Sequence, residues 1–195
     1  LQKVVLTTLN EIRPIPRLWP FPGTYRGALM TIHSAETMPR AALGYADWAR
    51  ANEGSSTIFA AADRFNSHHG AIAKEIGAEI GLVWVIGEDR EPMTESVGFG
   101  ALEPWARELS LPRQKAGLER TLGKSRSLRL ARTESALWEN DWSSTFRTLA
   151  AAGIRVDASF GPSEASQFGY LFGTGLPFYP LDERGLPLPI LEAPF

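Results

Sequence analysis

The chain has 195 residues, 44% of them apolar, and a formal net charge of -2, which is the composition of one ordinary globular domain. The near-neutral charge argues against a nucleic-acid partner, which requires a clustered basic face, and against a membrane contact held by charge. No apolar run approaches the roughly 20 residues that span a bilayer, and the lack of cysteine excludes disulfides and thiol chemistry.

Short apolar segments alternate with helical patterns along the chain, which predicts β–α units and a mostly parallel sheet. Residues 1–24 carry four prolines between positions 14 and 22, and because proline blocks helix and central-strand hydrogen bonds we expect an extended N-terminal arm. The predicted strands, in order, are Ala28–Ile32, Ser56–Ala61, Ile80–Ile86, Ser127–Ala131, Ile154–Asp157 and Leu188–Leu191.

Four helices are predicted between these strands. Three of them are followed by a glycine, Gly77, Gly123 or Gly153, and glycine is the usual left-handed residue after a helix. Residues 161–187 are rich in glycine and proline and are expected to be mostly loop. The predicted helices are Pro39–Asn52, Ser67–Ile76, Pro112–Leu122 and Asp141–Ala152.

The stretch Gly27–Glu36 has the form of a strand that stops in polar residues just before a helix. It resembles the first strand of the polysaccharide deacetylases, the NodB-homology family of carbohydrate esterases, in which the strand ends in Thr-Phe-Asp-Asp-Gly. In that family the first Asp is the catalytic base and the second is a metal ligand. Here His33 and Ser34 stand at those two positions.

Further segments resemble the same family in the same order, and they cover most of the chain. The resemblance implies one polysaccharide-deacetylase-like domain over residues 1–195, folded as a distorted, partly open (β/α) barrel. It also favours the cell envelope or the outside of the cell, and a carbohydrate as the ligand. The segments that carry it are Ser56–Ala61, Ile72–Gly81, Arg132 with Trp138 and Trp142, Ala152–Ser159 and Leu191–Pro194.

Both ends of the chain bear on this comparison. The chain begins at Leu1 rather than methionine, as a mature or excised fragment does. It stops at Phe195, whereas the family usually continues to a further helix and a last histidine. Either the barrel is incomplete or the remainder has been lost or excluded.

The family's metal site also requires two histidines after the third strand begins, at positions that fall on about Val83 and Gly87 here. A catalytic metal site needs about three protein ligands and an open position. Because Ser34, Val83 and Gly87 replace Asp, His and His, we predict that no metal and no other cofactor binds.

His33 is the strongest catalytic candidate, because an imidazole can act as a base near neutral pH without a metal. The alternative is that His33 is a hydrogen-bonded structural residue. In the family the arginine at position 132 holds the base aspartate in place. With His33 in that slot, Arg132 is expected to turn to Glu134, Asp157 or an anionic ligand, since an unpaired buried arginine is costly.

Aromatic and polar side chains near the predicted strand ends form the candidate ligand-binding set. Trp84 and Trp138 are placed to stack on sugar rings, with a place in the core as the alternative. Glu36 is placed to pair with His33 or with a ligand hydroxyl, although an acid is also favoured near a helix N-terminus. Ser34 and Glu134 complete the set.

Two functions follow. The first is a deacetylase-like domain that has lost its metal site and its activity and has a carbohydrate-binding or accessory role. The second is an active hydrolase on N- or O-acetyl groups, with His33 as the base, Arg132 stabilising negative charge and Asp157 supporting them. In either case His33, Trp84, Arg132 and Asp157 are expected around one depression at the carboxyl ends of the strands. The sequence indicates no particular protein partner.

Overall fold

A computed structural model describes residues 24, 31–35, 38–85, 104–123, 127–134, 143–161 and 175–194. By its internal contacts the chain divides into a segment Leu1–Met30 and a compact unit Thr31–Phe195. The expectation of a single domain over residues 1–195 stays a prediction. Every helix and strand that the structure describes lies in the second unit.

The compact unit is built on one parallel sheet of six strands in the order β1-β2-β3-β4-β5-β6. Each strand pairs with its successor along the chain, and the sheet is not closed between β1 and β6. This confirms the predicted open (β/α) architecture. The strands are β1 (Ile32–Ser34), β2 (Thr57–Ala60), β3 (Glu79–Trp84), β4 (Leu130–Thr133), β5 (Val156–Asp157) and β6 (Leu191–Glu192).

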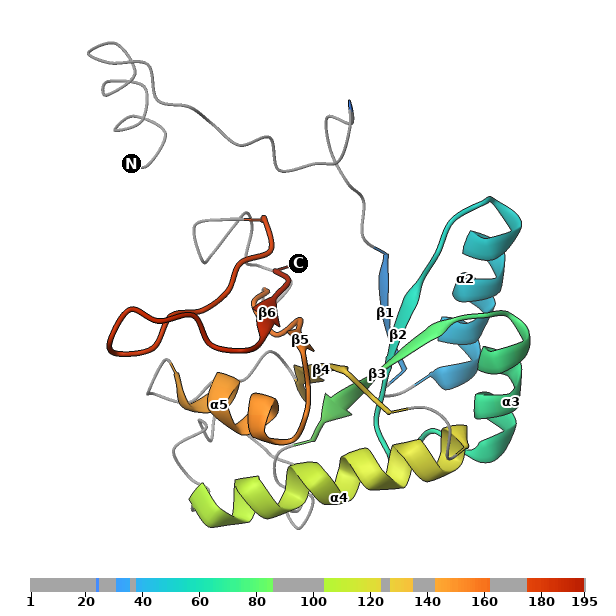
Figure 1. Cartoon of the computed structure of the whole chain (residues 1–195). Coiled ribbons are helices and arrows are strands. Elements are labelled where there is room, and N and C mark those ends of the chain that lie inside the picture. The colour runs from blue at the N-terminus through green and yellow to red at the C-terminus, as the bar shows by residue number, and fades with distance from the viewer. Residues whose placement is uncertain are drawn as a thin grey trace, which may run out of the picture. The chain divides into compact units, whose positions relative to one another are not determined.

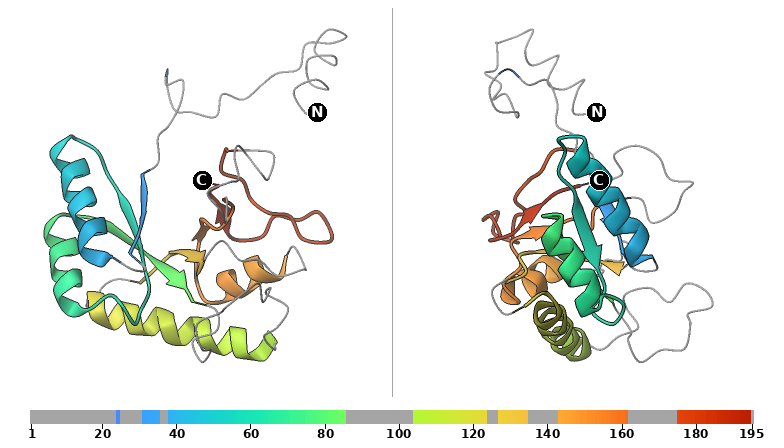
Figure 2. Two further views of the ribbon diagram at one scale, coloured as in Figure 1. Left: turned by 180° about the vertical axis from the view of Figure 1, so that it is seen from behind. Right: turned by 90° about the vertical axis from the view of Figure 1, so that its right-hand side faces the viewer.

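Four helices lie along the sheet: α2 (Pro39–Ala51), α3 (Ser67–Glu75), α4 (Pro104–Leu122) and α5 (Ser144–Ala151). Helices α2, α3 and α4 follow one another around one side of the curved sheet (Figures 1 and 2). The glycines predicted after three of the helices, Gly77, Gly123 and Gly153, all have positive φ, from 67° to 90°. Their left-handed backbone ends each helix and turns the chain towards the next strand.

Helix α3 begins with a reciprocal cap. The Asn66 side chain accepts a hydrogen bond from the backbone N–H of His69 (3.1 Å), and His69 Nδ1 accepts one from the backbone N–H of Asn66 (3.3 Å). Two N–H groups that the helix leaves unpaired are satisfied in this way. His69 therefore has a structural role at the start of α3.

The sheet has two distinct apolar faces, because side chains alternate along a strand and partners in parallel register point the same way. The helix-side face packs Ile58, Leu82 and Ala131 against the helices in the main core. The opposite face, which we call the inner face, carries a smaller cluster. Its buried members are Phe59, Ala61, Val83 and Ala158, with Ile32, Val85 and Leu130 packed against them.

Several predicted boundaries differ from those in the structure, and two of them have a clear physical reason. Strand β1 runs over Ile32–Ser34 rather than ending at Ile32, because its polar last residues still pair with β2 up to Ser34↔Phe59. The other error concerns α4, which begins at Pro104 and keeps Pro112 inside it. Leu111 and Leu118 are both fully buried in the main core, so packing on either side of the proline holds one continuous helix.

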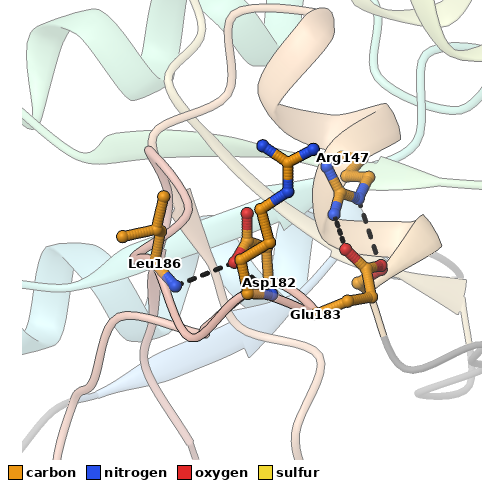
Figure 3. Close-up of polar contacts among 6 residues, drawn as sticks. Arg147, Asp182, Glu183 and Leu186 are labelled. Carbon is orange, nitrogen blue, oxygen red and sulfur yellow. Dashed lines mark hydrogen bonds and ion pairs between the residues drawn. The ribbon is translucent and has the colours of Figure 1, made fainter.

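The C-terminal residues 175–194 lie beside β5, at the end of the sheet remote from α2 (Figure 2). They contain a tight turn in which Asp182 Oδ1 accepts hydrogen bonds from the N–H groups of Arg184 (2.9 Å) and Leu186 (2.8 Å). Glu183, in the same turn, forms an ion pair with Arg147 of α5 (Figure 3). The turn is therefore tied to the helix beside it.

Candidate functional site

The family resemblance implies a metal site on the inner face of β1–β3. Ser34 is in register with Phe59, and Phe59 with Gly81; Val83 follows two residues after Gly81 and shares its face. Ser34 is exposed at the end of β1, but Val83 is fully buried and Phe59 is 1% exposed. This part of the sheet is thus covered by apolar side chains.

Gly81 shows how closely the face is packed. A Cβ built on Gly81 would lie 2.5 Å from Cε1 of Phe59 and 3.2 Å from Cβ of Leu130. The Phe59 ring therefore lies directly over the backbone of β3. A glycine is required at position 81 because no side chain fits beneath that ring.

Ser34 and Val83 do not fit the ligand positions of a catalytic metal. Valine has no donor atom, a neutral serine hydroxyl is a poor ligand, and Val83 is packed beside the apolar ring of Phe59. Across the ranges that the structure describes, no group of three or more His, Asp or Glu side chains is placed to hold a metal ion. Gly87, the third position implied by the resemblance, lies outside those ranges.

His33 and Trp84 lie on the helix-side face. His33 is in register with Ile58 of the main core, and its ring stacks on Tyr45 of α2, with centroids 5.4 Å apart and planes 15° from parallel. Trp84 is 1% exposed and donates from Nε1 to Ser110 Oγ of α4 (3.0 Å). Both side chains make contacts typical of the layer between sheet and helices.

Helix α4 also holds the end of β3 through the buried Gln114. Its Nε2 donates to the carbonyl of Val85 (2.7 Å), and its Oε1 accepts from the N–H of Val85 (2.9 Å). Both polar groups of the residue after β3 are satisfied by one side chain. The carboxyl end of β3 is therefore fixed from the helix side.

Arg132 and Asp157 come from neighbouring strands. Arg132 is in register with Val83 of the inner face, whereas Asp157 is in register with Ala131 of the main core. The Arg132 guanidinium nevertheless acts on the Asp157 carboxyl, whose pKa it lowers relative to burial alone. These two candidates are thus electrostatically linked, although their strand positions alternate.

The arrangement differs from the expectation that His33, Trp84, Arg132 and Asp157 surround one depression. Arg132 occupies an inner-face position, while the other three occupy helix-side positions. Glu134 follows β4 and is half-buried. Glu36 and Trp138 lie outside the described residues. A functional role for each of these residues stays a prediction.

Asp157 has a buried acidic partner that was not among the candidates predicted from the sequence. Asp157 and Glu192 are both 0% exposed and are in register on β5 and β6. Ser159 Oγ donates to Asp157 Oδ1 (2.6 Å), and the N–H of Phe160 donates to Glu192 Oε1 (3.0 Å). Ser159 Oγ in turn accepts from the N–H of Thr133 (2.9 Å). The acid pair, as we call Asp157 and Glu192, thus ties together the ends of β4, β5 and β6.

The remaining carboxyl oxygens, Asp157 Oδ2 and Glu192 Oε2, are buried and have no other partner. A hydrogen bond between the two side chains satisfies both, and it requires one proton. Burial raises the pKa of Asp157, and hydrogen bonds from Ser159 and Glu192 partly oppose this. Burial, reinforced by the neighbouring Asp157 charge, raises the pKa of Glu192 further. The shared proton therefore resides on Glu192.

The sequence contained an indication that Glu192 is a buried, paired acid. It is the one charged residue between Leu186 and Phe195, at the end of an otherwise apolar segment, and Asp157 likewise ends an apolar strand. Buried acids at two strand ends point to pairing. The predicted strand order made these two strands neighbours, but it did not indicate that Asp157 and Glu192 would stand opposite each other in the register.

Solved structures with the same fold were found by comparison of the coordinates. A protein assigned as a polysaccharide deacetylase from Mycobacterium smegmatis matches with a TM-score of 0.56 and 15% identity over 85% of this chain. A mutant of a family 4 carbohydrate esterase pseudoenzyme with restored enzymatic activity matches with a TM-score of 0.50 and 11% identity over 66%. The fold is that of the polysaccharide deacetylases.

A family 4 carbohydrate esterase from Streptomyces lividans, in complex with acetate, has a TM-score of 0.47 and 12% identity over 68% of this chain. The chain spans 62%, 42% and 57% of the lengths of the Streptomyces, pseudoenzyme and Mycobacterium chains, respectively. No family model matches the sequence, and neither does any curated protein. In the described part of the chain, no helix combines the length and apolar character needed to cross a membrane.

Proposed function

We propose that this chain is a polysaccharide deacetylase-like protein that has lost the metal site, is inactive as a metal-dependent deacetylase, and binds carbohydrate or assists a protein that processes it. The observation that carries the proposal is the inner cluster. Val83, at a position where the resemblance implies a histidine ligand, is fully buried beside Phe59. A metal-activated water would have no support there.

Exposed aromatic rings on α2 support carbohydrate binding. Tyr45 and Trp48 lie three residues apart on one side of the helix and are 61% and 67% exposed. The stack with His33 orients the Tyr45 ring. Flat amphipathic rings of this kind bind well to the apolar faces of sugars, which also present hydroxyls to water. Two such rings on one helix side therefore form a platform for a glycan.

The alternative is a hydrolase that acts on acetyl groups without a metal and uses His33 as its base. The contact between His33 and Tyr45 favours the binding function instead, because it places the imidazole beside the exposed aromatic rings of α2. A general base must come within hydrogen-bond reach of the proton that it removes. A substrate for His33 would have to bind at the β1–α2 side of the sheet.

Acetate release from acetylated chitin oligomers and from simple acetyl esters separates these functions. The purified chain is expected to release none above the blank, with or without a chelator, while a family 4 carbohydrate esterase serves as the active control. Release that a chelator abolishes would contradict the proposal. Release that persists with chelator and disappears in His33→Ala would establish the alternative.

Binding is tested by affinity electrophoresis in gels that contain soluble acetylated or deacetylated polysaccharide. Retardation of the wild-type chain is expected, with a loss of about fivefold or more in affinity for Trp48→Ala, which corresponds to about 1 kcal/mol. Met38→Ala is the matched control, because Met38 is 66% exposed beside the same helix but has no ring. Equal retardation of the two variants would remove α2 from the binding site.

A further inference from the structure

The C-terminal residues 175–194 are joined to the sheet by a short strand. β6 contributes two residues to the sheet, with hydrogen bonds from the N–H of Leu191 to the carbonyl of Arg155 (2.8 Å) and from the N–H of Ala193 to the carbonyl of Asp157 (2.8 Å). By contrast, β2 and β3 are in register over four residue pairs. The attachment of this segment therefore depends strongly on its side chains.

Within that short strand, Glu192 lies opposite Asp157 of β5, and both carboxyl groups are fully buried. One oxygen of each carboxyl already accepts a hydrogen bond, from Ser159 in one case and from the N–H of Phe160 in the other. The other two oxygens are buried and oppose each other across the β5–β6 register. One proton joins them, whereas without it two negative charges would face each other in a dry site.

The surroundings hold little else that could compensate for a second charge. The Arg132 guanidinium of β4 acts on Asp157, whereas Arg147 of α5 and Glu183 of the C-terminal turn pair with each other and are largely exposed. The nearby side chains Phe146, Phe160 and Phe178 are aromatic, with ring centroids 5.6 and 5.9 Å apart in succession. Their rings supply no charge that would replace the proton.

We propose that the proton shared by Asp157 and Glu192 is a latch, which holds residues 175–194 closed on β5 and whose loss releases them while β1–β4 remain folded. The opening is local because the longer ladders of β1–β4 lie on the other side of β5, and residues 175–194 contribute only Leu188 and Ile190 to the main core. The edge of β5 then becomes free to accept another strand. This inference does not depend on the proposed function.

The direction of the pH response is set by the two raised pKa values. A group whose pKa is higher in the closed state stabilises that state fully below its open-state pKa of about 4. This stabilisation is lost as the pH rises towards the closed-state value. The opening equilibrium constant should therefore increase by up to about tenfold per pH unit above neutrality.

The absence of cysteine from the chain makes thiol labelling a direct test on the full-length protein. Ala193→Cys places a thiol at a position that is 6% exposed beside β6, and Ala73→Cys places one at a fully buried position in α3. Labelling rates from about pH 6.5 to 9 are divided by those of the exposed Leu186→Cys, which corrects for thiolate formation. The same three cysteines are then placed in a Glu192→Gln background.

The proposal predicts that the corrected rate at position 193 rises by about tenfold or more over this range, while the rate at position 73 stays flat. Glu192→Gln should abolish the rise, because the amide keeps both hydrogen bonds and does not ionise. Glu183→Gln, in the same segment, should leave it unchanged. Parallel increases at both positions, or an increase that survives Glu192→Gln, would overturn the latch. Hydrogen exchange of the unsubstituted chain, corrected for intrinsic rates, is a second test. Exchange should accelerate with pH in the peptides that contain β6 and not in those that contain α3.

Discussion

The two ends of the sheet differ in the side chains that they bury. At β1–β3, where the resemblance implies acids and histidines around a metal, the inner face consists of Phe59, Gly81 and Val83 in tight apolar contact. At β5–β6, in two segments that also resemble the family, the carboxyls of Asp157 and Glu192 are fully buried and share a proton. Among the described residues, the fully buried carboxyls therefore join neighbouring strands at the end of the sheet remote from β1.

The two ends of the sheet also differ in what their stability requires. The stability of the inner face depends on close packing, because a methyl group at Gly81 would collide with the Phe59 ring. The acid pair depends on protonation, because its oxygens are satisfied only when one proton is present. Substitutions at the two ends should therefore respond differently to pH.

The largest expected effect is that of Glu192→Ala. It leaves the Asp157 charge and the N–H of Phe160 buried without their partner, and loss of one member of a buried pair typically costs about 3–5 kcal/mol. Urea unfolding at neutral pH measures the loss. Glu192→Gln is the matched control and should cost less than about 1.5 kcal/mol. If the two variants unfold at the same urea concentration, the pair contributes no hydrogen bond to stability.

A smaller effect is expected at Gly81. Gly81→Ala should destabilise the fold by about 1–3 kcal/mol, as for other overpacked sites, since its Cβ would lie 2.5 Å from the Phe59 ring. Gly44→Ala is the opposite control: it is exposed within α2 with no atom within 4 Å of the new Cβ, and should stabilise by up to about 1 kcal/mol. Equal shifts in melting temperature would show that the inner face is loosely packed. Neither shift should change with pH.

The smallest effect is expected at Glu183, which is exposed. Its hydrogen bond from Ser143, with a contribution from Arg147, lowers the pKa of Glu183. A lowered pKa stabilises the fold above the unfolded-state value, and this stabilisation is lost as the pH falls through the folded-state value. Glu183→Gln should thus lower the melting temperature slightly at pH 7 and not at about pH 3. A decrease that is larger at pH 3 would contradict this sign.

Much of the fold was predictable from the sequence, because strands and helices here follow local patterns. All six strands and four helices were predicted, and the caps at Gly77, Gly123 and Gly153 follow from a single-residue rule. The boundary errors at β1 and at Pro112 arose where tertiary pairing and packing override local preference.

The site was less predictable, because it depends on the face of each strand. Trp84 was predicted within a strand and His33 just after one, yet their contacts with Ser110 and Tyr45 depend on the register of β3 and β1 against their neighbours. The acid pair required Asp157 and Glu192 to stand opposite each other in the register of β5 and β6. Such non-local pairings cannot be deduced from the pattern of a single strand.

The decisive measurement for the proposed loss of the metal site is the metal content of the purified full-length chain. After growth in metal-supplemented medium and dialysis, we expect elemental analysis to find zinc, cobalt and nickel each well below one equivalent. That result is expected because Ser34 and Val83 supply no adequate ligand set on the inner face. About one equivalent of any of these metals, removed by a chelator, would contradict the loss of the metal site.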